Sequence, residues 1–452
     1  MVDNAFVTQG LYLGVEATRG VAVPATRRVI GFDLTSKIDA TATEFRPLGS
    51  KFVTVDALQE EWTSGTIAGA VCYTELPYLL SSVMRQSPAP VQQMDGATAT
   101  GAYKWVFDSN AFDADNPITY TVEQGNSARA RRFTYMMLTD YSLSIARNAV
   151  THTGTVMAQQ HQDNVNLTTL SLAAPVLGVP VASAAGGTFA AGTYFFQVSA
   201  INAAGETLPS VEARAATTGA TGSVVLTWAA VTGATGYRVY RAATSGAESV
   251  TPALVAAVGA VTTYTDTGSV TTAGAALTGN PTAAPAAPLP STSLTPVLAS
   301  QVDVFVDPTF AALGTTRQSR IFKVDPNIGS RYKPVWPLDS SKPSWAAHVE
   351  AANTATCNFT ASYDQQGAAF LGQLRVGSTV FMRVRALGQA IYNGAITVNH
   401  SLTIDMAVKI KQADAFSDTD GVFAIGYGTD IVYDGGWGKA LHVEVVSSLA
   451  AL

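Results

Sequence analysis

Charged residues are scarce in this 452-residue sequence. They make up 13% of it, against 47% hydrophobic residues, and the net charge is −6 with no long run of either sign. Tight nucleic-acid binding requires basic residues that displace counterions from phosphates, so the composition does not favour that function. A soluble monomer needs a charged surface without large apolar patches. The low charge therefore predicts that much of the surface is buried against other subunits.

Cysteine is also scarce, and long apolar runs are absent. Cys72 and Cys357 lie in apolar strand-like segments and are expected to be two buried thiols. No stretch approaches the ~20 apolar residues of a membrane helix, so no membrane partner is expected. The first residues contain no basic region followed by an apolar one, so no signal peptide is expected. We expect a protein that is made and used in solution.

The remaining pattern is mainly β and indicates a duplicated domain whose two copies are separated by an insert. We predict a first domain at 1–174, an inserted β-sandwich at 175–285 and a second domain at 286–452. Both outer domains show a strand, a long Pro-containing excursion, a strand, a helix and further strands. Apolar residues at helical spacing predict the two helices, at 74–85 and 364–375.

The longest predicted strand begins at Ile396 and ends at Lys411. Its apolar positions, from Val398 to Ile410, alternate strictly with polar ones. This length exceeds the usual 3 to 10 residues of a strand. We therefore expect it to cross two subunits or to bend around a barrel.

The insert has short alternating strands separated by Gly, Ala and Thr turns. Tyr194, Phe196, Val198 and Ala200 share one side of its first long strand, and its Trp228 strand follows. This pattern predicts a small β-sandwich. It resembles fibronectin type III and related immunoglobulin-like modules, in a permuted strand order.

No catalytic, cofactor or metal site emerges, and we do not expect an enzyme. The five histidines are scattered, and His400 is interpreted as a core residue. The segment around Asp420 and Gly421 is better explained as an Asp-Gly hairpin turn than as a calcium loop. Arg129, Arg131 and Arg132 are interpreted as a solvated edge or a subunit salt bridge rather than a phosphate site.

The layout of both outer domains resembles the major tail tube proteins of long-tailed bacteriophages with non-contractile tails. The resemblance covers LYLGVEATRGVAVPATR and the FRPLG excursion in the first domain, and VFMRVRALG, SLTIDMAVKIKQ and SDTDGVFAIGYGTDIV in the second. It implies a β-sandwich with a flanking helix and a stacking loop. It also implies rings whose inner sheets join into a barrel around a DNA channel.

The resemblance implies the partners and candidate residues. The partner is the chain itself, in trimeric rings of pseudo-six-fold symmetry or, alternatively, hexamers, with tape measure, terminator and baseplate proteins as further partners in a virion tail. DNA would pass through without specific binding. The proposed lumen residues are Asn399, Ser401, Thr403 and Asp405, with Ser142 and Ser144 in the first domain. The proposed ring-stacking arms span 44–61 and 327–345, with Phe45, Phe52, Trp62, Tyr332, Trp336 and Trp345.

Two alternative functions remain open on the sequence. One is another structural virion protein, either a capsid-decorating or a tail-terminator subunit. The other is a secreted adhesion or carbohydrate-binding protein in which the sandwich is a spacer. That protein would normally show a signal peptide and exposed aromatic clusters.

Overall fold

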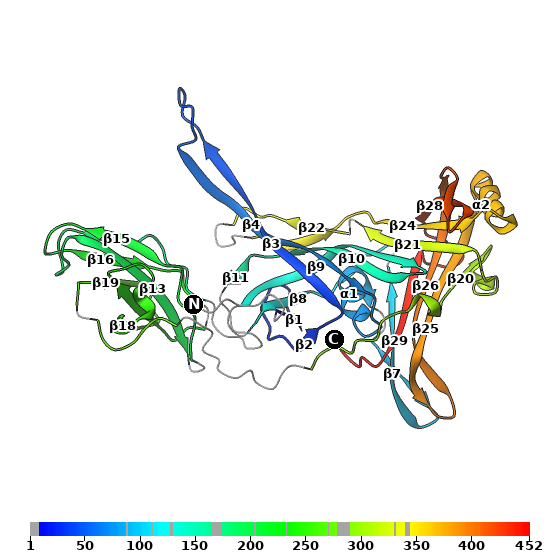
Figure 1. Cartoon of the computed structure of the whole chain (residues 1–452), viewed down its shortest axis with the longest axis horizontal. Helices are drawn as coiled ribbons and strands as arrows, with labels where there is room; N and C mark the ends of the chain where they lie inside the picture. The colour runs from blue at the N-terminus through cyan, green and yellow to red at the C-terminus, as the bar shows by residue number, and fades with distance from the viewer. Residues whose placement is uncertain are drawn as a thin grey trace.

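The computed structural model describes residues 9–86, 89–109, 112–126, 130–163, 174–202, 205–231, 233–269, 271–277, 290–329, 331–339 and 344–452. Its described part consists mainly of antiparallel strands, with one helix in each half of the chain (Figure 1). The predicted mainly β fold class is confirmed. In that part of the chain, no helix has the length and apolar character needed to cross a membrane.

The two halves follow the same order of elements. The first contains β1 (Gly10–Val15), β3 (Phe32–Phe45), β4 (Val55–Ala70), α1 (Leu76–Val83), β8 (Tyr120–Gly125), β9 (Ala130–Ala146), β10 (Ala149–Ala158) and β11 (His161–Asp163). The second contains β20 (Val302–Asp307), β21 (Ile321–Gly329), β24 (Thr354–Ser362), α2 (Gln365–Val376), β25 (Thr379–Asn393), β26 (Thr397–Ala413), β28 (Val422–Ile431) and β29 (Leu441–Ser447).

Strand pairing repeats in the same way. The first half pairs β1 with β8, β8 with β9, β9 with β10, β10 with β4, β4 with β3, and β9 with β11. The second half pairs β20 with β25, β25 with β26, β26 with β28, β28 with β24, β24 with β21, and β26 with β29. Each half is therefore a copy of one topological unit, and a β9–β21 pairing joins the two units.

Additional elements decorate this repeated unit. They are β2 (Arg27–Val29), β5 (Arg85–Gln86), β6 (Val91–Asp95), β7 (Thr98–Asp108), β22 (Tyr332–Val335), β23 (Ala347–Glu350) and β27 (Ser417–Thr419). The β6–β7 hairpin belongs to the first half in sequence, yet β7 pairs with β29 of the second half. This exchange adds a second sheet contact between the halves.

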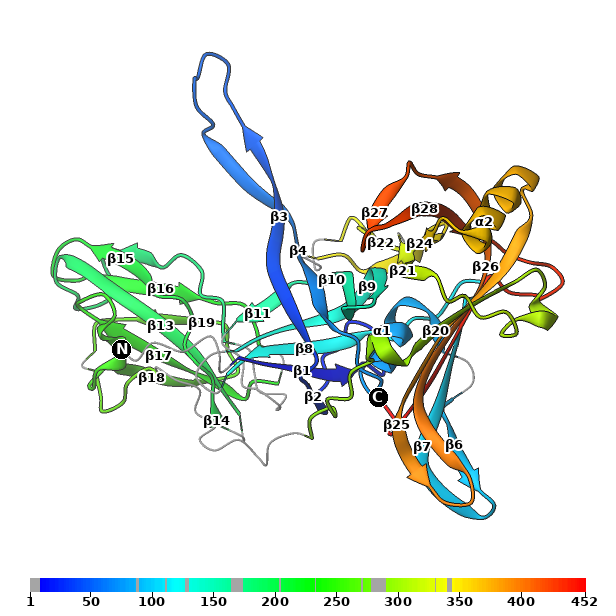
Figure 2. The same ribbon diagram turned by 45° about the vertical axis from the view of Figure 1, so that its right-hand side comes forward.

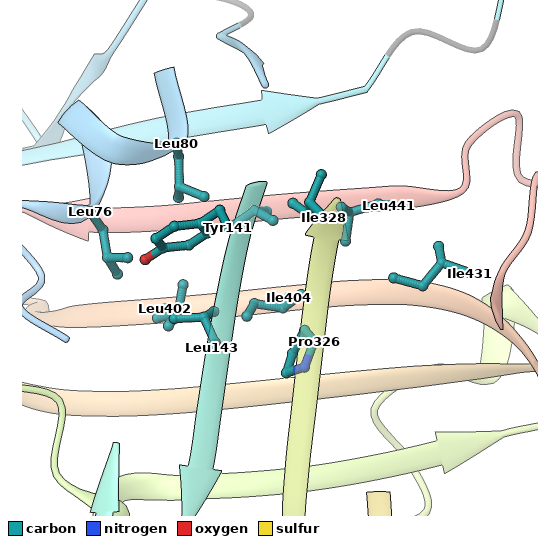
Figure 3. Close-up of a pocket in the computed structure, with 11 residues that line it drawn as sticks. Leu76, Leu80, Tyr141, Leu143, Pro326, Ile328, Leu402, Ile404, Ile431 and Leu441 are labelled. Carbon is teal, nitrogen blue, oxygen red and sulfur yellow. The ribbon is translucent and has the colours of Figure 1, made fainter. Parts of the chain in front are cut away.

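The core lies between two layers of strands. The first layer has the order β3–β4–β10–β9–β21–β24–β28, and the second has β20–β25–β26–β29–β7. Figure 3 shows β9 and β21 crossing the strands of the second layer, with leucines of α1 beside them. Tyr141, Leu143, Ile328, Leu402 and Ile404 meet there around an apolar cavity of about 20 Å³. One apolar cluster extends through both halves.

Local sequence explains the helices and the long strand. Pro77 occupies the first turn of α1, where its missing N–H costs no hydrogen bond. Helix α2 ends at Val376 and is followed by Gly377, whose φ of +69° favours glycine. In β26 the predicted alternation is confirmed, because Leu402, Ile404 and alternate residues up to Ile410 are buried.

Three smaller predictions are also confirmed. Asp420 and Gly421 have φ values of 53° and 77° and connect β27 to β28, as expected for an Asp-Gly hairpin turn. Cys72 and Cys357 are buried free thiols. Burial raises the pKa of Cys72 to about 11, so the thiol stays protonated at neutral pH. His400 is a buried residue stacked on Tyr73, as predicted for a core histidine.

The insert is a separate sandwich of two sheets. Strands β12 (Val181–Ser183), β16 (Ser223–Thr227) and β19 (Thr263–Asp266) form one sheet. The other contains β13 (Gly192–Asn202), β14 (Gly205–Glu206), β15 (Ala213–Thr217), β17 (Gly236–Ala242) and β18 (Leu254–Gly259). Phe196, Val198, Val224, Leu226 and Trp228 form its core. The predicted sandwich is confirmed, whereas its boundaries at 175 and 285 and its immunoglobulin-like ancestry stay predictions.

Candidate assembly surfaces

The outer face of the first layer is polar and crosses the junction between the halves. Ser142 and Ser144 of β9 lie on it, and their assignment to a lumen stays a prediction. The Ser144 hydroxyl donates to Asp325 Oδ1 at 2.8 Å, and Asn327 donates its amide to Ser142. Thr151, Thr153 and Thr155 of β10 continue this exposed face. It presents hydroxyl, amide and carboxylate groups to its surroundings.

Lysines on the same face are paired with carboxylates. Lys37 and Lys323 lie 2.8 Å from Asp39 and Asp325, respectively. Lys411 pairs with Asp430 in the second half. These pairs reduce the positive charge available to a polyanion.

The other four proposed lumen residues occupy a different surface. Asn399, Ser401, Thr403 and Asp405 belong to the part of β26 that pairs with β25 and β29 in the second layer. They alternate with Leu402 and Ile404, which face the core. The six residues therefore lie on two opposite outer faces, and the prediction that they share one surface is corrected. The physical reason is that β26 leaves the second layer at Met406 and pairs with β28 of the first layer from Val408 onward.

Asp405 illustrates this difference. It is 3% exposed, and Arg383 binds both of its carboxylate oxygens at 2.6 and 2.7 Å. These hydrogen bonds raise the pKa of Arg383. Asp405 is thus an ion-pair partner within the sheet rather than a free charge.

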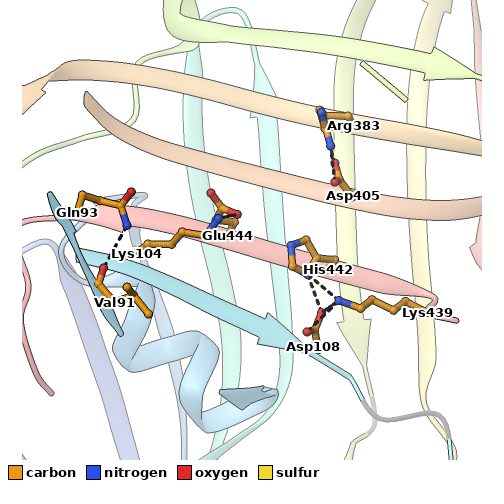
Figure 4. A network of polar contacts seen from close by, with 9 residues as sticks. All are labelled: Val91, Gln93, Lys104, Asp108, Arg383, Asp405, Lys439, His442 and Glu444. Carbon is orange, nitrogen blue, oxygen red and sulfur yellow. Dashed lines mark hydrogen bonds and ion pairs between the residues drawn. The ribbon is translucent and has the colours of Figure 1, made fainter. Parts of the chain in front are cut away.

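A polar groove of about 390 Å³ surrounds that pair (Figure 4). Asp108 of β7 lies 2.6 Å from His442 Nδ1 and 3.0 Å from Lys439 Nζ. Burial raises the pKa of Asp108, but these two partners outweigh it, and the pKa is lowered overall. Since β7 comes from the first half and β29 from the second, this network ties the halves together.

The first predicted arm is a free hairpin. Strands β3 and β4 extend well beyond the body of the chain (Figures 1 and 2), and residues 46–54 form the tip. Phe45, Leu48, Phe52 and Val53 are exposed there. Such a group of apolar side chains on a projecting element indicates a contact surface. The assignment of Phe45 and Phe52 to ring stacking stays a prediction.

The second predicted arm folds back on its own chain. Strands β22 and β23 cover part of β9 and β10, where Tyr332 and Trp345 are buried against Tyr135 and Met157. Trp345 donates through Nε1 to the carbonyl of Ala158 at 3.1 Å. Tyr332 and Trp345 are therefore buried within their own chain, and their assignment to ring stacking stays a prediction. Sequence reasoning placed this segment on the surface because it could not foresee its partners on β9 and β10.

Two tryptophans connect the arms. Trp62, at the base of the first arm, makes an edge contact with Trp336 of the second, with ring centroids 5.7 Å apart. Both are partly buried. They support the base of the first arm rather than its tip.

A buried charge cluster anchors the second arm, and sequence reasoning missed it. Arg331 is fully buried and pairs with Asp115 and Glu350, the latter at 2.7 Å. Its carboxylate partners lie 216 and 19 residues away, so no local motif could have revealed them.

The predicted arginine cluster divides into different environments. Arg132 is buried 3.8 Å from Glu123, which corrects its interpretation as a solvated edge. Arg131 is less buried and approaches the carbonyl of Ser36 at 3.5 Å. Arg129 lies outside the described residues. Among the described residues, no group of His, Cys, Asp and Glu is arranged to hold a metal ion.

Comparisons with known proteins add little. No family model matches the sequence, and no curated protein matches it. Among the solved structures that match, one described as the crystal structure of Hcp protein aligns at 11% identity with 28% of this chain and 86% of its own length. The TM-score is 0.17, so nothing is inferred from this similarity.

Proposed function

We propose that this chain is a structural subunit that polymerises as stacked rings into a tube, and specifically that it is a major tail tube protein of a long-tailed, non-contractile bacteriophage. The observation that carries the proposal is the regular register of the repeated sheet. The first four-stranded unit consists of β3, β4, β10 and β9, and the second consists of β21, β24, β28 and the end of β26. The two units lie side by side, and the β9–β21 pairing joins them edge to edge.

The register gives the tilt of the strands. A row of paired residues begins at Leu34 and passes through Ile67, Gly154 and Tyr141 to Ile328. Gly154 and Tyr427 each lie six residues after the turn of their hairpin, and they pair with Ile67 and Phe359, respectively. Since Ile67 pairs with Leu34 and Phe359 with Val324, Val324 is the residue of β21 that corresponds to Leu34. The row of paired residues therefore reaches β21 at Ile328, four residues beyond Val324. The sheet is staggered by four residues for every four strands.

This stagger matches that of a closed barrel. Four residues at about 3.3 Å each, over four strands about 4.8 Å apart, correspond to a tilt of about 35°. Closed barrels have tilts of about 35–45°. A wall of six such units would have 24 strands and a backbone diameter of about 45 Å at this tilt. With two units per chain, three chains complete it.

The polar face described above suits a channel for DNA. Ser142 and Ser144 line it near the junction of the halves, and the lysines Lys37, Lys323 and Lys411 are paired with carboxylates. A channel with little free positive charge would not retain phosphates. We assign the opposite face, with its groove around Asp405, to the outside of the wall.

Electron microscopy and native mass spectrometry of the purified protein test this function. We expect rings of three chains with a pseudo-six-fold outline and a central channel, stacking into tubes. Six chains per ring would contradict the two-unit count. A protein that stays monomeric at high concentration would contradict tube formation altogether.

A further inference from the structure

We propose that neighbouring copies join through the same contact that joins the two halves inside one chain. The outer edge of β3 in one copy would pair with β27 and the end of β26 in the next copy. This inference rests on the proposed function and deepens it, because it names the partner, a second copy, and the register of the contact.

The internal junction is the template. Strand β21 pairs with β9 through Val324 opposite Ile145 and Ile328 opposite Tyr141. All four residues are buried. Strand β3 is the counterpart of β21, but within the described residues its only strand partner is β4. Its other edge is where a counterpart of β9 would lie.

The counterpart of β9 is the β26–β27 segment. Gly154 pairs with Tyr141 in the first half, and Tyr427 pairs with Ala413 in the second, so Ala413 corresponds to Tyr141. Gly154 and Tyr427 each lie six residues after the turn of their hairpin. By the same comparison, Asp418 corresponds to Ile145. Asp418 pairs with Phe423, and Ile145 pairs with Val150.

The register between copies follows from these correspondences. Since Leu34 corresponds to Val324, Ile38 corresponds to Ile328. Ile38 should therefore lie opposite Ala413 of the next copy, and Leu34 opposite Asp418. Ile38 is 48% exposed in the single chain, whereas Ile328, inside the internal junction, is 6% exposed. The contact would bury Ile38 as the internal junction buries Ile328.

Exposed apolar residues lie on both sides of the proposed contact. Ile30, two residues before β3, is exposed like Ile38. On the other side, Phe416 contacts Tyr363 and Phe423 with ring centroids 4.8 and 6.0 Å apart, and all three are exposed. An exposed aromatic cluster beside a strand edge fits a protein interface better than a solvated hairpin tip.

The arms support the same arrangement. The second arm crosses the internal junction, where Tyr332 donates to the carbonyl of Val83, the last residue of α1, at 3.4 Å. The tip of the first arm is exposed and makes no such contact with the described part of its own chain. The last residue of α2, Val376, is 80% exposed and is the corresponding position on the next copy. The exposed tip of the first arm would pack there.

Side chains protect the β3 edge in the single chain. Gln124 donates through Nε2 to the carbonyl of Leu34 at 2.7 Å and accepts from the Ser36 hydroxyl at 2.9 Å. Arg131 approaches the carbonyl of Ser36. Such capping limits uncontrolled edge pairing. On assembly, backbone N–H groups of the next copy would replace these donors.

Disulfide trapping tests the register. Residues directly opposite each other on antiparallel strands have Cβ atoms about 4.5–5.5 Å apart, close enough for a disulfide with slight adjustment. We expect the I38C/A413C double variant, oxidised after assembly, to give a covalent ladder that ends at three chains on non-reducing gels. The buried Cys72 and Cys357 should not contribute. The matched control, A42C/A413C, moves one cysteine four residues, about 13 Å, along β3 and should give no ladder.

The outcomes separate this inference from the proposed function. Rings in the microscope without a ladder from I38C/A413C, or with one from the control pair instead, would overturn the register and leave tube formation standing. Absence of rings from the unmodified protein would overturn both. As a second variant, Ile38→Asp should abolish rings without changing the circular dichroism spectrum, while Val179→Asp, at an exposed site of the insert, should not. Rings formed by Ile38→Asp would contradict the contact.

Discussion

Replacing Trp345 tests whether the second arm is an internal clamp. Its indole is 1% exposed, lies 4.3 Å from the ring of Tyr135 between centroids, and donates to the carbonyl of Ala158. Removing a buried aromatic side chain costs about 3–5 kcal/mol. In Trp345→Ala this loss should lower the free energy needed for β22 and β23 to detach locally from the first half.

Hydrogen exchange of the backbone amides measures that opening directly. Because about 1.4 kcal/mol corresponds to a tenfold change, Trp345→Ala should speed exchange of β22 and β23 by about 150-fold to 4,000-fold. Trp345→Phe keeps most of the apolar contact but leaves the carbonyl of Ala158 without its donor. That change costs about 1–3 kcal/mol, or roughly 5-fold to 150-fold in exchange.

The control is Leu338→Ala, a fully exposed residue of the same arm, which should leave exchange unchanged. Trp345→Ala should also leave the length of assembled tubes unchanged, since the indole faces its own chain. Normal exchange of β22 and β23 in that variant would refute the clamp. Normal exchange with short tubes would instead return Trp345 to the ring-stacking role.

Three further predictions concern the rest of the chain. Deleting residues 175–285 and closing the gap with a short Gly/Ser bridge should still give tubes in the microscope; soluble protein that never polymerises would place the insert in the wall. Thr153→Lys, on the exposed polar face, should create DNA binding that weakens with salt, measured by fluorescence anisotropy, while Val179→Lys in the insert should not. The lowered pKa of Asp108 means that its pairing stabilises the fold at neutral pH and is lost as the pH falls below about 4. Asp108→Asn should therefore reduce stability at pH 7 and make acid unfolding less steep, and an unchanged acid transition would argue against this role for the pair.

Local pattern predicted the elements that depend on neighbouring residues. Alternation from Val398 to Ile410 predicted β26, helical spacing predicted α1 and α2, and Asp420 with Gly421 predicted a hairpin. Each of these features is fixed within one strand, helix or turn. Their physical cause is therefore present in a short window of sequence.

Long-range pairing could not be read in the same way. The alternation of β26 is uniform, so nothing in it marks the point after Met406 where the strand leaves β29 for β28. Tyr332 and Trp345 look like surface aromatics until β9 supplies their partners. Arg331 finds its carboxylates across the fold. The surface assigned to each residue depends on which strand becomes its neighbour.

The difference between the two arms limits how one ring can sit on another. The first arm projects freely, whereas the second is bound to its own chain (Figure 2). In a trimeric ring, arms bound within one chain and arms bound to the next chain would alternate around the circumference, so the true symmetry would be three-fold. Successive rings could then dock in three equivalent rotational settings rather than six. The setting adopted at each step would determine the rotation between neighbouring rings along the tube.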